Sequence, residues 1–164
     1  MKTFDEMIDF ILDEIERGYA NIIPDNGGET NWGISSVNHP ELKGRIKSLT
    51  REEAKQIYWD EYWLKAEISS YPERLRLAVF DGAINHGVVG NNKLVQRALN
   101  SMRCKIDVDG ILGPMSKGAV RQVSPLRFLA AYNRQRLELY RQHEDYRWAK
   151  NGWETRLFMT CAAS

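Results

Sequence analysis

The first 34 residues constrain the fold most strongly, because a clear helix signal runs directly into a turn-rich loop. Thr3-Phe4-Asp5-Glu6 has the spacing of a capping box. Apolar residues then follow at helical intervals, namely Phe4, Met7, Ile8, Ile11, Leu12 and Ile15, and Gly18 is a typical helix stop. Two short, partly β-branched stretches, residues 19–23 and 30–34, flank Pro-Asp-Asn-Gly-Gly, which predicts a small β-hairpin.

The remainder of the chain predicts helices. A second capping box, Thr50-Arg51-Glu52-Glu53, opens a helix that reaches Tyr62, and Pro72 suits the first turn of an apolar, buried helix through Ile84. Further helices are predicted at residues 92–100, from about Met115, from Ser124-Pro125, and as a short last helix after Gly152-Trp153. The predicted fold is therefore mainly α with one small hairpin after the first helix.

Composition excludes several classes of protein. The 164 residues fit one globular domain or a domain with a small second lobe, and no apolar run approaches the ~20 residues that cross a bilayer. The chain carries 23 basic and 22 acidic residues, a balance that argues against a dedicated nucleic-acid binder. Acidic residues interrupt the N-terminal segment, so we expect no signal peptide and no stable membrane insertion.

Neither a metal nor a cofactor is predicted. Cys104 and Cys161 are too few for a disulfide scaffold, and we expect both to be free thiols. The three histidines are scattered without metal-site spacing, and Asp107-Val108-Asp109-Gly110 lacks the closing glutamate of a calcium loop.

Glu16 is the first candidate for chemistry. It lies at the edge of the apolar stripe of the first helix and in its last turn, where the helix dipole disfavours a negative charge. Partial burial and the helix terminus both favour a protonated carboxyl, which a general acid needs. Taken alone, an exposed glutamate that merely ends a helix is the commoner case.

Asp25 and Thr30 follow in the predicted loop and strand. Asp25 is surrounded by backbone amides and solvent, so we expect it to stay ionised and to stabilise positive charge or orient a water. Thr30 could hold that water. An Asx-turn role for Asp25 and a plain strand position for Thr30 remain open alternatives.

These residues form a pattern that resembles the signature of glycoside hydrolase family 108, the bacterial and phage N-acetylmuramidases. That signature runs Glu-Gly-Gly-Tyr, Asp-Pro-Gly-Gly and Thr-Asn-x-Gly-Ile. The residues that match it in order and spacing are Glu16, Tyr19, Asp25, Gly27, Gly28, Thr30, Asn31, Gly33 and Ile34. Arg17 and Asn26 depart from it, and neither replaces a proposed catalytic group.

The resemblance spans almost the whole chain. Residues 78–87 are similar to the family's buried helix, and residues 96–99, 109–110 and 113–114 are similar to the peptidoglycan-binding region that usually follows it. The resemblance thus implies a lysozyme-like helical fold, with a muramidase catalytic region at residues 1–87. Residues 88–164 would form a helical peptidoglycan-binding region packed on it as one compact unit.

Four residues are expected to bind substrate. Tyr19 belongs to the family pattern, and Trp32 lies beside Thr30 on the hairpin, where its ring could stack on a sugar. Asp81 and Asn85 lie one turn apart on an otherwise apolar helix, so they face either a wet sugar-binding cleft or a buried polar network.

The resemblance implies a peptidoglycan hydrolase that cleaves the β-1,4 bond between N-acetylmuramic acid and N-acetylglucosamine, with Glu16 as general acid. A lytic transglycosylase and a non-catalytic wall-binding module are the alternatives, and a helical DNA-binding protein is the weakest. We expect a monomeric phage endolysin, made in the host cytoplasm and released to the wall in the periplasm with the help of a holin-type partner. A bacterial muramidase exported by a non-standard route is the open alternative.

Overall fold

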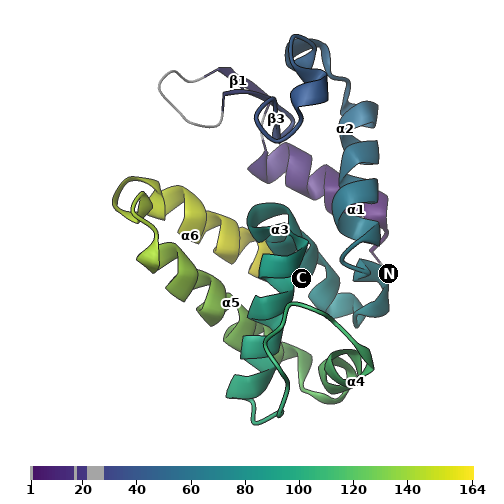
Figure 1. Ribbon diagram of the computed structural model, residues 1–164, viewed down its shortest axis with the longest axis vertical. Coiled ribbons are helices and arrows are strands. Elements are labelled where there is room, and N and C mark those ends of the chain that lie inside the picture. The colour runs from purple at the N-terminus through teal and green to yellow at the C-terminus, as the bar shows by residue number, and fades with distance from the viewer. Residues whose placement is uncertain (1, 17, 22–27) are drawn as a thin grey trace. The chain divides into compact units, whose positions relative to one another are not determined.

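A computed structural model describes residues 2–16, 18–21 and 28–164. The chain divides into two compact units, Met1–Glu61 and Tyr62–Ser164, and helices dominate both (Figure 1). The mainly helical, lysozyme-like fold predicted from the sequence is confirmed. The assignment of residues 1–87 and 88–164 to two functional regions stays a prediction.

The first helix begins as predicted but ends differently. Thr3 accepts a hydrogen bond from the Glu6 amide and Glu6 reaches back to the Thr3 amide, so the capping box opens α1 (Phe4–Phe10). The helix then widens into a π-helical turn, η1 (Ile11–Ile15), and the Glu16 amide donates to Ile11 O at 2.8 Å. Glu16 is therefore the C-cap residue of this helix. Because π-helical turns occur frequently at functional sites, the position of Glu16 agrees with a functional role.

A three-stranded antiparallel sheet follows in the order β1 (Tyr19–Asn21), β2 (Glu29–Asn31) and β3 (Ile34–Ser35). The predicted hairpin pairs β1 with β2. The predicted strand 30–34 is interrupted, because Asn31 pairs with Ile34 across a two-residue turn, Trp32-Gly33.

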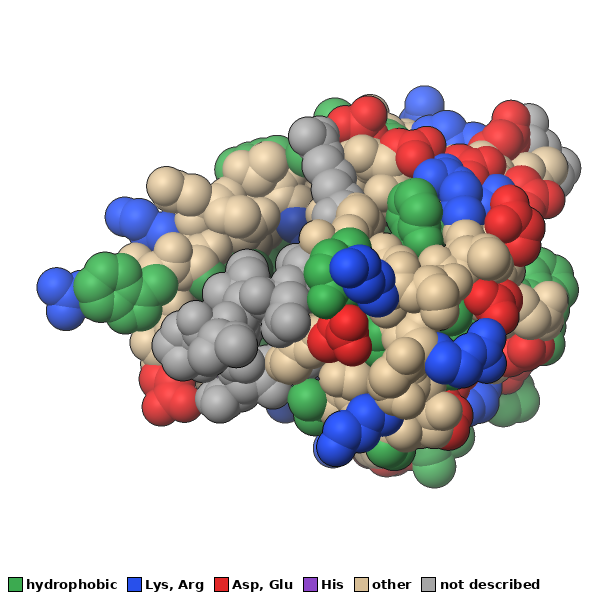
Figure 2. All heavy atoms as spheres, turned by 90° about the horizontal axis from the view of Figure 1, so that it is seen from above, with side chains coloured by type: hydrophobic (Ala, Val, Ile, Leu, Met, Phe, Trp, Pro, Cys, Tyr) green, Lys and Arg blue, Asp and Glu red, His purple; other side chains and the backbone are tan. Residues whose placement is uncertain are grey.

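The rest of the first unit holds this sheet in place. Short 3-10 helices η2 (Pro40–Leu42) and η3 (Ile46–Ser48) precede α2 (Arg51–Tyr58), which the second capping box opens. A second π-helical segment, η4 (Trp59–Leu64), continues α2. Arg51 bonds Asp9 and Asp13 of the first helical segment at 2.7 and 2.6 Å, and acidic side chains lie next to basic ones on the face shown in Figure 2.

The second unit is built on one long helix. After η5 (Ile68–Ser70), α3 (Glu73–Ser101) joins the two helices predicted at 72–84 and 92–100, with a break in helical geometry at Gly87, whose φ is 68°. The other helices are α4 (Pro114–Gln122), α5 (Pro125–Gln142) and α6 (Tyr146–Ala163), the last longer than predicted. Both α5 and α6 pack on α3 and lie side by side (Figure 1).

A buried ion network ties these three helices together. Asp81 on α3 accepts from Arg136 Nη2 of α5 at 2.7 Å and from Arg156 Nε of α6 at 2.8 Å. Burial alone would raise the pKa of the Asp81 carboxyl, but the guanidinium groups of Arg156 and Arg136 outweigh it and hold the pKa below its usual range. Because the side chains of Asp81 and Arg136 are both 0% exposed, removing either partner would leave a buried charge without its counter-ion.

His86 and Tyr140 extend the network. Arg136 Nε donates to His86 Nε2 at 3.3 Å, and the Tyr140 hydroxyl donates to Asn85 Oδ1 at 2.5 Å. Burial of the ring, followed by the positive charge of Arg136, lowers the pKa of His86 to about 3. The imidazole is therefore neutral in the folded protein.

Two further features of the described residues bear on the sequence predictions. Cys104 and Cys161 are both free thiols. In the described part of the chain, every helix is too short or too polar to cross a bilayer.

The His86 pKa predicts how stability depends on pH. Between pH 6.5 and 3 the unfolded chain binds a proton that folded His86 excludes, so the free energy of unfolding rises with pH across this window. Replacing His86 by glutamine keeps an acceptor for Arg136 but removes the titration. From pH 6.5 down to about pH 5, the wild type should therefore lose about 1–2 kcal/mol more than His86→Gln.

Chemical denaturation across this range measures the difference. Asp81 titrates below its usual range and does not contribute here. Parallel stability curves for the two proteins would contradict the structural role assigned to His86.

Candidate active site

The turn Trp32-Gly33 has a conformation that most residues avoid. The φ angles are 53° at Trp32 and 75° at Gly33, as a two-residue type I′ hairpin turn requires. Glycine adopts such angles freely, but tryptophan does not, and a bulky residue held there costs on the order of 1–3 kcal/mol. Backbone strain of this kind concentrates at functional sites.

Three contacts hold Trp32 in this strained position. Its indole N–H donates to Leu49 O at 3.1 Å, and its carbonyl accepts from the Tyr58 hydroxyl at 2.9 Å. The Arg51 guanidinium lies over the ring, 5.4 Å from its centre. The neighbouring Asn31 is buried and donates to the carbonyls of Ile46 and Leu49, which fixes the base of the turn.

Gly33 leaves room for Glu16. A Cβ atom at Gly33 would lie 2.9 Å from both Cγ and Cδ of Glu16, and closer still to the hydroxyl oxygen of Tyr58. The Glu16 carboxyl and the Tyr58 hydroxyl therefore meet on one side of the Gly33 backbone. Glu16 is half-buried there, while Tyr58 is buried at the end of α2.

This arrangement suits an acid catalyst. The π-helical turn ends at Glu16, the strained turn bounds one side of its carboxyl, and partial exposure leaves access to a ligand. A carboxyl fixed in position at a partly desolvated site can deliver a proton to a bound oxygen.

The predicted residues on the strands take different positions. Thr30 lies in the middle of β2, opposite Ala20 and Ser35, and is half-buried. Tyr19 on β1 is 42% exposed, and its hydroxyl donates to Glu29 Oε1 at 2.9 Å. Asp25 lies outside the described residues.

The remaining predicted residues, Asp81 and Asn85, belong to the second unit. Asp81 is completely buried, with its oxygens bonded to two arginines, so the buried-network alternative describes it, and the substrate-binding interpretation has no access route in this structure. Asn85 is half-buried and accepts from Tyr140; its binding role stays a prediction.

Two residues of this unit were not among the predicted site residues. Glu29 directly precedes Thr30 and accepts a hydrogen bond from the predicted residue Tyr19. Tyr58 lies 42 positions after Glu16, and no local pattern connects the two.

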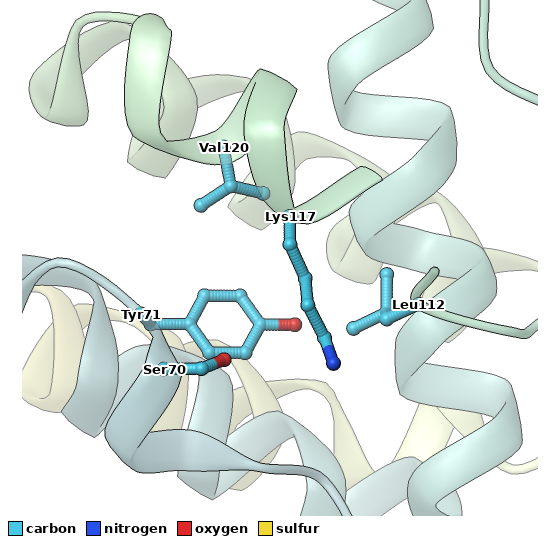
Figure 3. Close-up of a pocket in the computed structure, with 5 residues that line it drawn as sticks. All are labelled: Ser70, Tyr71, Leu112, Lys117 and Val120. Carbon is cyan, nitrogen blue, oxygen red and sulfur yellow. The ribbon is translucent and has the colours of Figure 1, made fainter. Parts of the chain in front are cut away.

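Two further features of the described residues concern metal binding and cavities. No group of three His, Cys, Asp or Glu side chains there could hold a metal ion. A cavity of about 10 Å³ lies in the second unit, where the Tyr71 hydroxyl points toward Lys117 (Figure 3). It has room for about one water molecule.

The chain was compared with protein-family models, curated proteins and solved structures. Residues 8–87 match the family model described as Glycosyl hydrolase 108. Among solved structures, SagA of Brucella abortus is 26% identical with a TM-score of 0.86, and the match covers 98% of this chain and 92% of that one. No curated protein gives a significant match. The resemblance found in the sequence is confirmed, and the family model supports a glycoside hydrolase.

The packing at Gly33 predicts a large effect of one methyl group. Gly33→Ala must displace Glu16 or Tyr58, and misplacing a catalytic group by about 1 Å costs roughly 100-fold in rate. Hydrolysis of purified cell walls should fall by about that factor.

Gly44→Ala is the matched control. Gly44 also has a positive φ, 82°, but a Cβ there would meet nothing within 4 Å, so this variant carries the backbone strain without the collision. Equal activity of the two variants would exclude the proposed packing role of Gly33.

Proposed function

We propose that this chain, whose residues 8–87 match the model of glycosyl hydrolase family 108, is an N-acetylmuramidase with Glu16 as its general acid. It would hydrolyse the β-1,4 bond between N-acetylmuramic acid and N-acetylglucosamine in peptidoglycan. The observation that carries the proposal is the fixed, half-buried position of Glu16 against the strained Trp32-Gly33 turn.

In the proposed reaction, the Glu16 carboxyl protonates the glycosidic oxygen as the bond to the anomeric carbon breaks. Positive charge then develops on the sugar ring, and a water molecule adds to it and loses a proton. Asp25 would stabilise that charge or accept the proton, and Thr30 would orient the water. These two roles rest on the family pattern.

Gly33 and Tyr58 contribute to this mechanism by positioning the Glu16 side chain. The Tyr58 hydroxyl commits its proton to Trp32 O, so its oxygen is left as an acceptor beside the Glu16 carboxyl. An acceptor beside the carboxyl helps to hold in place the group that donates to the leaving oxygen.

A lytic transglycosylase is the second candidate. Such an enzyme keeps the acid but closes an internal anhydro ring, so it needs no aspartate to activate water. Loss of activity in a folded Asp25→Ala variant would argue against it. Substrate binding by Tyr19, Trp32 and Asn85, the endolysin role, the release partner and the monomeric state stay predictions from the sequence.

Glu16→Gln tests the proposal against a non-catalytic wall-binding module. The amide is nearly the same size but cannot donate an acidic proton, so hydrolysis of cell walls should fall by about 100- to 10,000-fold. Binding of the variant to insoluble cell walls should be retained.

The control is Glu14→Gln, the same substitution two residues earlier at an exposed position of η1. It should keep wild-type turnover. Unchanged lysis by Glu16→Gln would refute the assignment of the acid.

A further inference from the structure

A groove runs along the surface of the second unit between α5 and α6. It encloses about 620 Å³, and its apolar lining includes Ala130 and Leu137 of α5 and Leu157 and Phe158 of α6. Phe158 is 73% exposed, although it lies beside this groove. All the residues that line the groove belong to the second unit, whereas Glu16 belongs to the first.

Two arginines line the groove, and three more exposed basic side chains lie on the same two helices. Arg127, Arg134 and Arg141 follow one another at seven-residue intervals, so they form a row along one face of α5. On α6, Arg147 precedes Phe158 by three turns on the same face, and Lys150 precedes the groove residue Glu154 by one turn. All five are exposed. We call these residues and the groove the α5–α6 face.

Acidic groups only partly offset this charge. Two carboxylates line the groove. Glu138 lies 3.9 Å from Arg134 Nε, and Glu154 accepts a hydrogen bond from the Tyr146 hydroxyl. Glu144 and Asp145, in the connection between the two helices, are exposed as well, so five bases stand against four acids and the face has a net charge of +1.

Large apolar side chains lie among these bases. Leu126 is 74% exposed and precedes Leu137 by three turns, so both occupy the same side of α5. Trp148 at the start of α6 is 80% exposed, with the Arg147 guanidinium 5.3 Å from its ring centre. Leucine, phenylalanine and tryptophan flanked by arginine and lysine are typical of surfaces that lie in the headgroup region of a bilayer.

The two units of the chain carry net charges of opposite sign, and the α5–α6 face belongs to the positive one. Met1–Glu61 holds seven basic and thirteen acidic residues, a net charge of −6, whereas Tyr62–Ser164 holds sixteen and nine, a net charge of +7. The overall charge of +1 hides this asymmetry. An anionic surface would therefore attract the second unit and repel the first.

We propose that the α5–α6 face docks on an anionic phospholipid surface. The arginine row meets lipid phosphates, while Phe158, Leu126 and Trp148 enter the boundary between headgroups and acyl chains. Binding is peripheral, in keeping with the absence of a membrane-spanning helix among the described residues. It does not depend on the proposed hydrolysis.

Two other occupants fit the face less well. A hydrophilic anionic polymer would use the arginine row but leave the apolar groove and Phe158 in water. A second copy of the chain in a two-fold dimer would bring five bases against the same five bases, which is repulsive.

The test measures binding of the full chain to vesicles that contain about 30% phosphatidylglycerol in phosphatidylcholine, with pure phosphatidylcholine as the neutral surface. We expect binding to the anionic vesicles only, and weaker binding as salt increases. Arg134→Gln/Arg141→Gln should weaken the partition coefficient by about 25-fold, since each basic residue contributes roughly fivefold. Phe158→Ser should weaken binding as well.

The control is Arg74→Gln/Arg97→Gln, which removes the same charge from exposed positions of α3. It should bind the anionic vesicles nearly as tightly as the wild type. Equal loss in both double variants, equal binding to neutral vesicles, or binding to soluble anionic polymer but not to vesicles would each overturn the proposal.

Discussion

The absence of a side chain at Gly33 is the constraint on which the candidate site depends. Because a Cβ at this position would collide with Glu16 and Tyr58, the acid can approach the turn only while residue 33 is glycine. The same turn forces Trp32 to a positive φ, and the Tyr58 and Leu49 contacts hold it there. The helix end, the hairpin and α2 thus converge on one carboxyl.

The second unit is organised by a different constraint, the buried charge of Asp81. One carboxylate shared by Arg136 and Arg156 fixes α5 and α6 against α3, and the neutral His86 completes the network without adding another charge. This arrangement also leaves the opposite sides of α5 and α6 exposed, where the basic and apolar residues of the α5–α6 face gather.

Much of the fold could be predicted from local patterns, and the remainder depends on contacts that no local pattern contains. Capping boxes at Thr3 and Thr50 correctly marked two helix starts, because both partners lie within four residues. The turn at Trp32-Gly33 was missed, since a tryptophan at positive φ is stable only through contacts with residues far along the chain. Asp81 was predicted as either a cleft or a network residue, and only the distant arginines of α5 and α6 decide between them.

The central claim is that Glu16 catalyses hydrolysis of the peptidoglycan glycan strand. Mass spectrometry of purified peptidoglycan digested by the protein tests it most directly, because hydrolysis and its main alternative leave different ends. If Glu16 is the general acid of a hydrolase, the wild-type digest contains fragments that end in reducing N-acetylmuramic acid, and the digest by Glu16→Gln does not. Fragments that end in anhydro-muramic acid, or glycan left intact by the wild type, would contradict it.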